Sequence, residues 1–274
     1  MKKILVPTDF SEQADYALGA AVQLAKKHNS EIHLLHIIEL PLQQVDAMST
    51  YSELPEAIFF MKLAQKHFEK LAQKDFLKNI KVHEHVEFHE IFRGIADVCK
   101  KQNIDLVLMG SQGANGLKEL LIGSNTEKVV RTSEVPVLVV KKEHPVFDIK
   151  SIVFASDFNE ESKSTYKKAV DFAKLLKAKL HLLMVNTPNK FLTTIEAEKQ
   201  IEAFTKSSDF KNYTVNIYND ETIEKGIMHF SESINADLIA MSTHGRQGIS
   251  HFFNGSISED LVNHAHRPVI TFKI

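Results

Sequence analysis

The sequence predicts an α/β fold built from two tandem domains with parallel sheets, over residues 1–143 and 148–274. Short apolar runs that are typical of buried parallel strands alternate along the chain with amphipathic helical patterns. The second half repeats the motifs of the first half in the same order. A length of 274 residues suits two domains of ordinary size, and His144-Pro145 lies between them as a linker.

The first half opens with a strand, a helix and a second strand. Residues 3–7 and 32–38 are apolar runs, and between them small and aliphatic residues recur at helical spacing. Ser11 or Asp9 is placed to cap this helix where it begins near Glu12. Strand, helix and strand in this order predict a right-handed unit with parallel strands.

The rest of the first half continues the alternation. The predicted elements are a loop over residues 39–54, a helix over 55–78, a strand over 82–88, a helix over 94–101, a strand over 106–109, a helix from about 125, and a strand over 137–140. The first half therefore contains five strands separated by four helices.

The internal repeat has two offsets. Asp157 matches Asp9 at an offset of 148 residues (157 − 9), whereas Gly245 matches Gly113 at an offset of 132 (245 − 113). The second half has therefore lost 16 residues (148 − 132) between its second and fourth strands, where connections tolerate deletion. A repeat of this length indicates duplication of a whole domain.

A glycine-rich segment between the fourth strand and the next helix carries the first functional signal. Gly110 and Gly113 follow the buried strand, and Gly123-Ser124 precedes a helix start. Glycine lets the backbone approach a ligand closely, and the first amides of a helix form an anion site with the helix dipole. We interpret the segment as a phosphate cradle in two parts. The alternative is a strand, turn and helix that bind nothing.

Composition bounds the class of protein. The formal net charge is −2, with 33 basic and 35 acidic residues, so no basic footprint for nucleic acid is present. The apolar run near the N-terminus is too short for a signal peptide core, and no run reaches the length of a membrane span. We therefore expect a cytoplasmic protein that binds neither nucleic acid nor a membrane.

Cysteine and histidine offer weaker signals. Cys99 is the only cysteine, so it forms no intrachain disulfide, and we expect it to be buried on a helix face. His83 and His85 share one face of a strand and His89 follows it. A metal site and a solvated strand face are both open, and the solvated face is favoured because no complete ligand set is visible.

Taken together, these motifs resemble the universal stress protein family. The first half carries G-x2-G-x9-G-[ST] as Gly110, Gly113, Gly123 and Ser124, the start V-P-T-D-F-S at residues 6–11, and L-H-x-x at 35–38. The second half is similar to a divergent copy, so the chain resembles a tandem member. The resemblance implies two doubly wound domains, each a five-stranded parallel sheet in the order 3-2-1-4-5 with helices on both faces. It places the ligand at the switch point between the first and fourth strands.

The resemblance also implies an adenine nucleotide, ATP or AMP or ADP, with Mg²⁺ as a companion cation. By position, the nucleotide site of the first half comprises Pro7, Thr8, Asp9, Ile37, Met109, Gly110, Gly113, Gly123, Ser124, Asn125 and Thr126. A weaker site in the second half comprises Ala155, Ser156, Asp157, Val185, Ser242, Gly245, Arg246, Gly255, Ser256, Ile257 and Ser258. Residues 7–9 would approach the nucleoside, the Ile37 backbone the adenine edge and Gly110 the ribose. The glycines and helix amides would hold the phosphates.

The second half departs from the motif. Ser242 replaces Gly110, which puts a side chain where backbone and sugar were expected to pass closely, although its hydroxyl could bond a ribose. Arg246 could pair with a phosphate or be a solvated charge. We therefore expect one tight site and one weak or empty site, with Asp9 serving either as a helix cap or as a ligand contact.

Three functions stay open at this stage: a nucleotide-binding stress-response regulator, a slow ATPase, and a stress factor with a non-nucleotide ligand. No catalytic residue and no metal ligand is assigned, because the sequence has no Walker lysine and no nucleophile elbow. The two halves should pack as a pseudo-dimer through their final strands, 137–140 and 269–272. A further homo-oligomer is also open.

Overall fold

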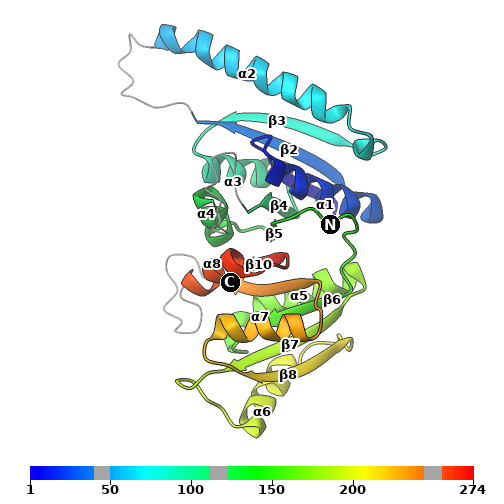
Figure 1. The fold of residues 1–274 in the computed structure, drawn as a ribbon, viewed down its shortest axis with the longest axis vertical. Coiled ribbons are helices and arrows are strands. Elements are labelled where there is room, and N and C mark those ends of the chain that lie inside the picture. The colour runs from blue at the N-terminus through cyan, green and yellow to red at the C-terminus, as the bar shows by residue number, and fades with distance from the viewer. Residues whose placement is uncertain (40–49, 112–122, 244–254) are drawn as a thin grey trace.

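The computed structural model describes residues 1–39, 50–111, 123–243 and 255–274, with side chains from residue 56 in the second range and residue 260 in the last (Figure 1). Ten strands form one sheet in the order β3-β2-β1-β4-β5-β10-β9-β6-β7-β8. The first half forms one end of this sheet and the second half the other.

The elements of the first half are β1 (Lys3–Pro7), α1 (Glu12–His28), β2 (Glu31–Ile38), α2 (Thr50–Ala72), η1 (Asp75–Leu77), β3 (Val82–Phe88), α3 (Ile91–Gln102), β4 (Leu106–Gly110), α4 (Ser124–Thr132) and β5 (Val137–Val140). Those of the second half are β6 (Ser151–Ala155), η2 (Glu160–Ser162), α5 (Lys163–Leu176), β7 (Lys179–Asn186), α6 (Thr194–Thr205), β8 (Tyr213–Asn219), α7 (Ile223–Ser233), β9 (Leu238–Thr243), α8 (Gly255–His264) and β10 (Val269–Lys273).

The predicted fold class and strand order are confirmed. Each half is a parallel sheet in the order 3-2-1-4-5, read as β3-β2-β1-β4-β5 and as β8-β7-β6-β9-β10. The two halves join where β5 pairs antiparallel with β10, with Leu138 opposite Ile270. These are the final strands that the sequence predicted as contact edges. Since each half offers an apolar edge, pairing them satisfies backbone groups that would otherwise stay open.

Helices cover both faces of the sheet. Alternate strand residues point to opposite sides, so Ile4 and Val6 belong to the core on the face that α1, α2, α5 and α6 cover, while Leu5 belongs to the core on the face that α3, α4, α7 and α8 cover. Because α1 and α5 lie on the same face, the pseudo-twofold axis that relates the halves runs perpendicular to the sheet. α2 and α6 lie at the two ends of the molecule (Figure 1).

Two predicted helix starts were wrong. α2 begins at Thr50 rather than Pro55, and α3 begins at Ile91 rather than Gly94. Gly94 is a buried residue inside α3, and a Cβ there would lie 2.9 Å from the Ile37 side chain. This glycine lets α3 approach β2 closely, so it does not mark a helix boundary. The predicted deletion is visible as an α6 of 12 residues against an α2 of 23.

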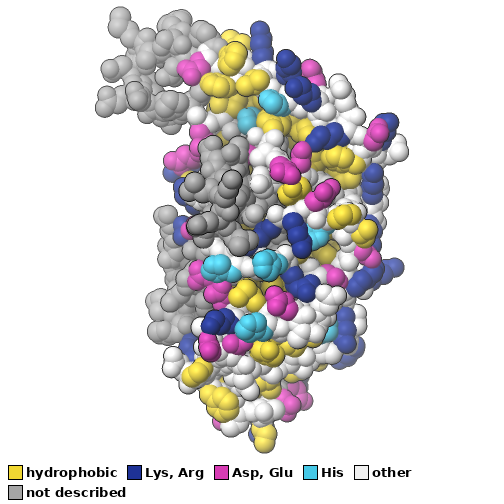
Figure 2. Space-filling view, in the orientation of Figure 1, with side chains coloured by type: hydrophobic (Ala, Val, Ile, Leu, Met, Phe, Trp, Pro, Cys, Tyr) yellow, Lys and Arg dark blue, Asp and Glu magenta, His cyan; other side chains and the backbone are white. Residues whose placement is uncertain are grey.

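The surface agrees with the near-neutral composition. On the face shown in Figure 2, Lys and Arg side chains are interspersed with Asp and Glu side chains over both halves. Within the described ranges, no helix combines the length and apolar character that a membrane span requires.

Candidate functional site

The switch point of the first half lies where β1 and β4 run side by side. These parallel strands pair through Ile4 with Leu106 and Leu5 with Val107. The helices that follow them, α1 and α4, leave toward opposite faces of the sheet. A ligand can enter between the two diverging connections, at the carboxyl ends of the strands. The strand ends that carry Asp9 and Gly110 are therefore neighbours in the sheet.

The turn after β1 is held by local hydrogen bonds. The Thr8 amide donates to Leu35 O at 2.8 Å, and the Thr8 hydroxyl accepts from the Phe10 amide at 3.0 Å. The Asp9 carboxylate accepts from the Ser11 amide at 3.1 Å. Ser11 is the N-cap of α1, which decides between the two predicted caps, and Asp9 stays exposed at the edge of the switch point.

Phe10 has a backbone conformation that the sequence did not indicate. Its φ is 62°, in the left-handed region, and Phe158 at the matched position of the second half has a φ of 53°. Aromatic residues rarely adopt this region, so no local signal could have predicted it. The Phe10 ring packs on His36 and His67, with ring centroids 4.7 and 4.6 Å apart. The strained turn recurs at both switch points, where it directs the chain from strand to helix.

The start of α4 is fastened to the end of β4. The Gly123 amide donates to Ser111 O at 2.7 Å, and the Thr126 hydroxyl donates to Gly110 O at 3.1 Å. Gly123 is the N-cap and brings no side chain to the first helical amides, those of Ser124, Asn125 and Thr126. These amides have no acceptor within the helix, and together with the helix dipole such amides favour an anion. The buried Thr126 hydroxyl is occupied by Gly110, so Thr126 offers its amide.

Packing alone requires a glycine at position 110, independently of any ligand. A Cβ built on it would lie 2.6 Å from Gln13 O in the backbone of α1. None of the described glycines has a positive φ, so glycine is needed at position 110 for space and not for conformational freedom. Close packing of α1 on β4 therefore accounts for this glycine.

Ser242, its counterpart, corrects our expectation about the second half. The Ser242 side chain is fully buried, and its hydroxyl lies 2.6 Å from the Thr165 hydroxyl of α5. The serine therefore packs against its helix without the close approach that Gly110 makes to Gln13. The ribose contact that we considered for this hydroxyl is replaced by a hydrogen bond inside the core.

Asp157 also differs from Asp9. Its carboxylate accepts hydrogen bonds from the Asn159 side chain at 2.8 Å and from the Ser162 hydroxyl at 3.3 Å. Gln200 of α6 donates to its backbone carbonyl at 2.7 Å. Asp157 is thus held against the start of the following helix and is only partly exposed.

The remaining predicted residues fall into four groups. Met109, Ala155, Ser156 and Val185 are buried, with exposed fractions of 6%, 2%, 2% and 4%. Ile37 and Val185 direct their side chains at Gly94 and Gly226, so only their backbone is available to a ligand. The residues Gly255, Ser256, Ile257 and Ser258 form the first turn of α8. Gly113, Gly245 and Arg246 lie outside the described residues.

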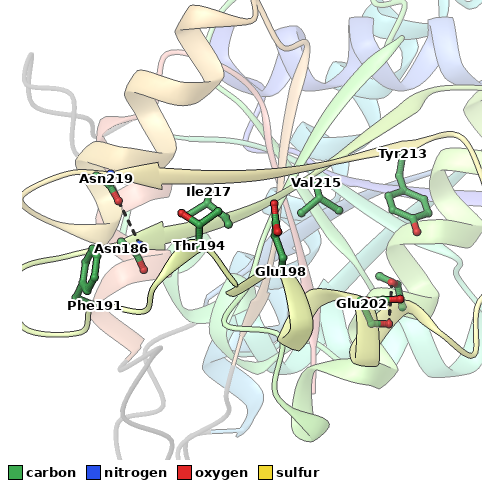
Figure 3. A pocket seen from close by; sticks show the side chains of 10 residues that line it. Asn186, Phe191, Thr194, Glu198, Glu202, Tyr213, Val215, Ile217 and Asn219 are labelled. Carbon is green, nitrogen blue, oxygen red and sulfur yellow. Dashed lines mark hydrogen bonds between the residues drawn. The ribbon is translucent and has the colours of Figure 1, made fainter. Parts of the chain in front are cut away.

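A groove that the sequence did not indicate lies at the far end of the second half (Figure 3). It has a volume of about 580 Å³ and lies between α6 and β8. Phe191, Val215 and Glu198 are among its lining residues, and Asn186 donates to the Asn219 side chain at 3.2 Å at one end. The groove lies at the edge of the sheet, two strands from β6, which forms the second switch point with β9.

Cys99 is buried on α3, as predicted. Burial raises the pKa of its thiol to about 12, so the thiolate that nucleophilic chemistry requires is suppressed. His83 and His85 are half-buried, so the strand face is solvated only in part, and both rings stack against the buried His33 of β2.

Comparison with known proteins identifies the family. The model of the universal stress protein family matches residues 1–141 and again 148–273. Over 291 aligned positions the chain is 23% identical to the universal stress protein Slr1230 of Synechocystis, and the match covers all of both chains. It is 35% identical to MJ0577 of Methanocaldococcus jannaschii over 52% of this chain and 96% of that protein. A crystal structure of a universal stress protein from Archaeoglobus fulgidus superimposes with a TM-score of 0.73 at 25% identity, covering 99% of this chain and 98% of that one. The chain therefore belongs to the universal stress protein family and carries two of its domains in tandem.

Proposed function

We propose that the first half binds ATP at the switch point between β1 and β4, and that the protein acts as a nucleotide-dependent regulator. The observation that carries the proposal is the start of α4. Its N-cap, Gly123, supplies no side-chain acceptor to the first helical amides, and two hydrogen bonds hold the helix start against the end of β4. A phosphate chain is the ligand that such amides suit best.

The neighbouring turn supplies the nucleoside end of the proposed site. The exposed Asp9 carboxylate and the partly buried Pro7 lie where the carboxyl end of β1 adjoins β4. A carboxylate suits sugar hydroxyls, which donate hydrogen bonds, and it repels phosphates. The nucleotide would therefore lie with its phosphates at α4, its sugar between the strands and Mg²⁺ beside the phosphates.

The groups at this edge favour binding over catalysis. Phosphoryl transfer needs a positioned nucleophile and cationic groups that stabilise the transferred phosphoryl. The amides at the start of α4 and the Asp9 carboxylate are instead suited to holding and orienting a nucleotide. We therefore propose a protein whose output is a change of conformation or partner upon nucleotide binding. A slow ATPase is the second candidate, and release of ADP and phosphate during long incubation separates the two.

The experiment is a calorimetric titration of ATP and Mg²⁺ into Gly123→Val and the matched Gly255→Val. Gly123 has φ −61° and ψ 141°, which valine also adopts, so the substitution adds a side chain over the amides without backbone strain. We expect Gly123→Val to abolish tight binding and Gly255→Val to preserve it. Unchanged affinity in a folded Gly123→Val would refute the proposal. Analysis of what the wild type releases on denaturation separates ATP from a non-nucleotide ligand.

A further inference from the structure

A cluster of histidine and glutamate side chains lies at the opposite edge of the first half from the switch point. Glu31 begins β2, His33 follows two residues later, and His83 of β3 is paired directly opposite His33. These residues lie at the amino ends of their strands, on the face that α3 covers. One ligand atom from each of the three lies within 4.8 Å of the others.

The rings of the cluster are stacked closely. His33 lies between His83 and His85, with ring centroids 4.7 and 5.2 Å away. Glu31 Oε2 and His83 Nε2 are 3.2 Å apart, and His33 Nδ1 is 2.9 Å from His85 Nε2. Atoms bound to one zinc ion at about 2.0–2.1 Å are roughly 3.3 Å apart in a tetrahedron. Small side-chain rotations would therefore bring the three ligand atoms to that spacing.

His33 has an unsatisfied nitrogen that points to a missing partner. Its side chain is only 2% exposed, and Nε2 has no hydrogen-bond partner among the described residues. One proton is shared between His33 Nδ1 and His85 Nε2. If His33 donates it, the His33 Nε2 lone pair is bare; if His85 donates it, a buried N–H lacks an acceptor. The first tautomer is the one that a metal-binding histidine adopts, with its other nitrogen oriented by a hydrogen bond.

We propose that Glu31, His33 and His83 form a binding site for a divalent transition metal ion, with Zn²⁺ as its best match. Two imidazoles and one carboxylate are a ligand set that zinc accepts, and three protein ligands leave one position open. His85 is the positioning residue that fixes the tautomer of His33. Glu31 and His83 have side chains that are 32% and 37% exposed, which gives the ion a path from solvent.

Two lysines set the charge around the site. Lys81 donates to Glu31 Oε1 at 2.8 Å, so Oε2 is the oxygen left for the ion. Lys3 lies on β1, the strand next to β2. Its ammonium donates to Gln102 O at the end of α3 and is therefore directed toward that carbonyl. The metal would tie β2 to β3, which is the terminal strand of the sheet.

The second half provides an internal control. At the offset of 148, Lys179 stands in place of Glu31 and His181 in place of His33. The His181 Nδ1 is 2.9 Å from the hydroxyl of Thr214, the residue paired opposite it in β8. A lysine and a threonine replace the carboxylate and the second imidazole, so the second half keeps the histidine without a ligand set.

The test measures Zn²⁺ binding to the nucleotide-free full chain by competition with a chromophoric chelator. We expect one saturable equivalent in the wild type, a loss of at least tenfold in His83→Ala and Glu31→Gln, and no change in His181→Ala. In His85→Phe the loss should be roughly 10–100-fold, the range for removing an outer-shell partner. Co²⁺ provides a second readout, since the visible absorption of a tetrahedral site should appear in the wild type and vanish in His83→Ala.

Absence of saturable Zn²⁺ binding in the wild type would overturn the proposal. Equal affinity in the wild type, His83→Ala and Glu31→Gln would also overturn it, because binding would then come from other histidines. Circular dichroism and melting temperature show whether each variant is folded, and zinc should raise the melting temperature of the wild type but not that of His83→Ala. ATP plays no part in this assay, so its outcome is independent of the proposed nucleotide site.

Discussion

Gly110→Ala tests why the glycine-rich motif has its first glycine. The added Cβ would lie 2.6 Å from Gln13 O and 2.8 Å from Gln13 C, where ordinary contact begins at 3.4 Å. α1 would have to move by about 0.8 Å (3.4 − 2.6). Eight residues of this helix, which lie between Ala14 and Ala25, are buried and would move with it. The obstacle is backbone, so no side-chain rotation relieves it.

The expected loss of unfolding free energy is about 2–3 kcal/mol, toward the upper end of the usual range for overpacking. For a chain of this size that corresponds to a fall of roughly 4–12 °C in melting temperature. Calorimetry and urea denaturation of the full chain measure both. Gly19→Ala in the same helix is the matched control, because a Cβ there meets nothing within 4 Å. It should stabilise the protein by about 0.5–1 kcal/mol.

Ser242→Ala provides the second comparison. It removes a hydroxyl that is bonded to Thr165 without creating a clash, so we expect a smaller loss of about 1 kcal/mol. If Gly110→Ala melts like the wild type and only its ATP affinity falls, the glycine is kept for the ligand and our packing argument is refuted. Loss of stability without ligand present would support packing as the cause.

Three further outcomes can be checked. Burial raises the pKa of Cys99 to about 12, so the native protein at pH 8 should resist thiol reagents and label fully once it is unfolded in urea; rapid native labelling would contradict this. Burial lowers the pKa of Lys141 from 10.5 to about 8. Between pH 8 and pH 10.5 the unfolded chain therefore binds more protons at Lys141 than the folded chain does, so the unfolding free energy of the protein rises with pH. The stability gained by Lys141→Met relative to the wild type should therefore be largest below pH 8 and shrink by pH 10, and a constant difference in urea denaturation would argue against a desolvated ammonium. Ile270→Asp buries a charge in the β5–β10 pairing and should destabilise both halves by roughly 3 kcal/mol or more, which limited proteolysis followed by fragment mapping would detect in each half.

Sequence patterns predicted the strands well because most of them are buried on both faces. Residues 4–7 and 137–140 are continuously apolar and lie in β1 and β5, and such runs favour a buried strand. The junction of the halves was also predictable, since an exposed apolar edge in each copy needs a partner. Helix starts were harder, because Gly94 reads as a helix boundary although it is a packing position inside α3.

The parts that the sequence did not predict depend on register between strands. His33 and His83 are 50 residues apart (83 − 33), and only the pairing of β2 with β3 brings their rings together. Alternation along one strand indicates which face of the sheet a histidine lies on, but it does not indicate which residue of the neighbouring strand is paired with it. The packing of helices on the sheet was equally hidden, because nothing near Ser242 indicated that its hydroxyl would meet Thr165 of α5.

The contrast between the two switch points now rests on different residues. Ser242 fits its position without strain, so a blocked backbone approach no longer explains why the second site would be weaker. The carboxylates differ instead: Asp9 is exposed, whereas Asp157 is held by Asn159 and Ser162. A nucleoside hydroxyl that approached Asp157 would compete with two hydrogen bonds already formed, each of which contributes about 0.5–1.5 kcal/mol. The second half thus has the fold of a binding domain with an aspartate that is half-buried and held by Asn159 and Ser162, while the aspartate of the first half, Asp9, is exposed at the proposed site.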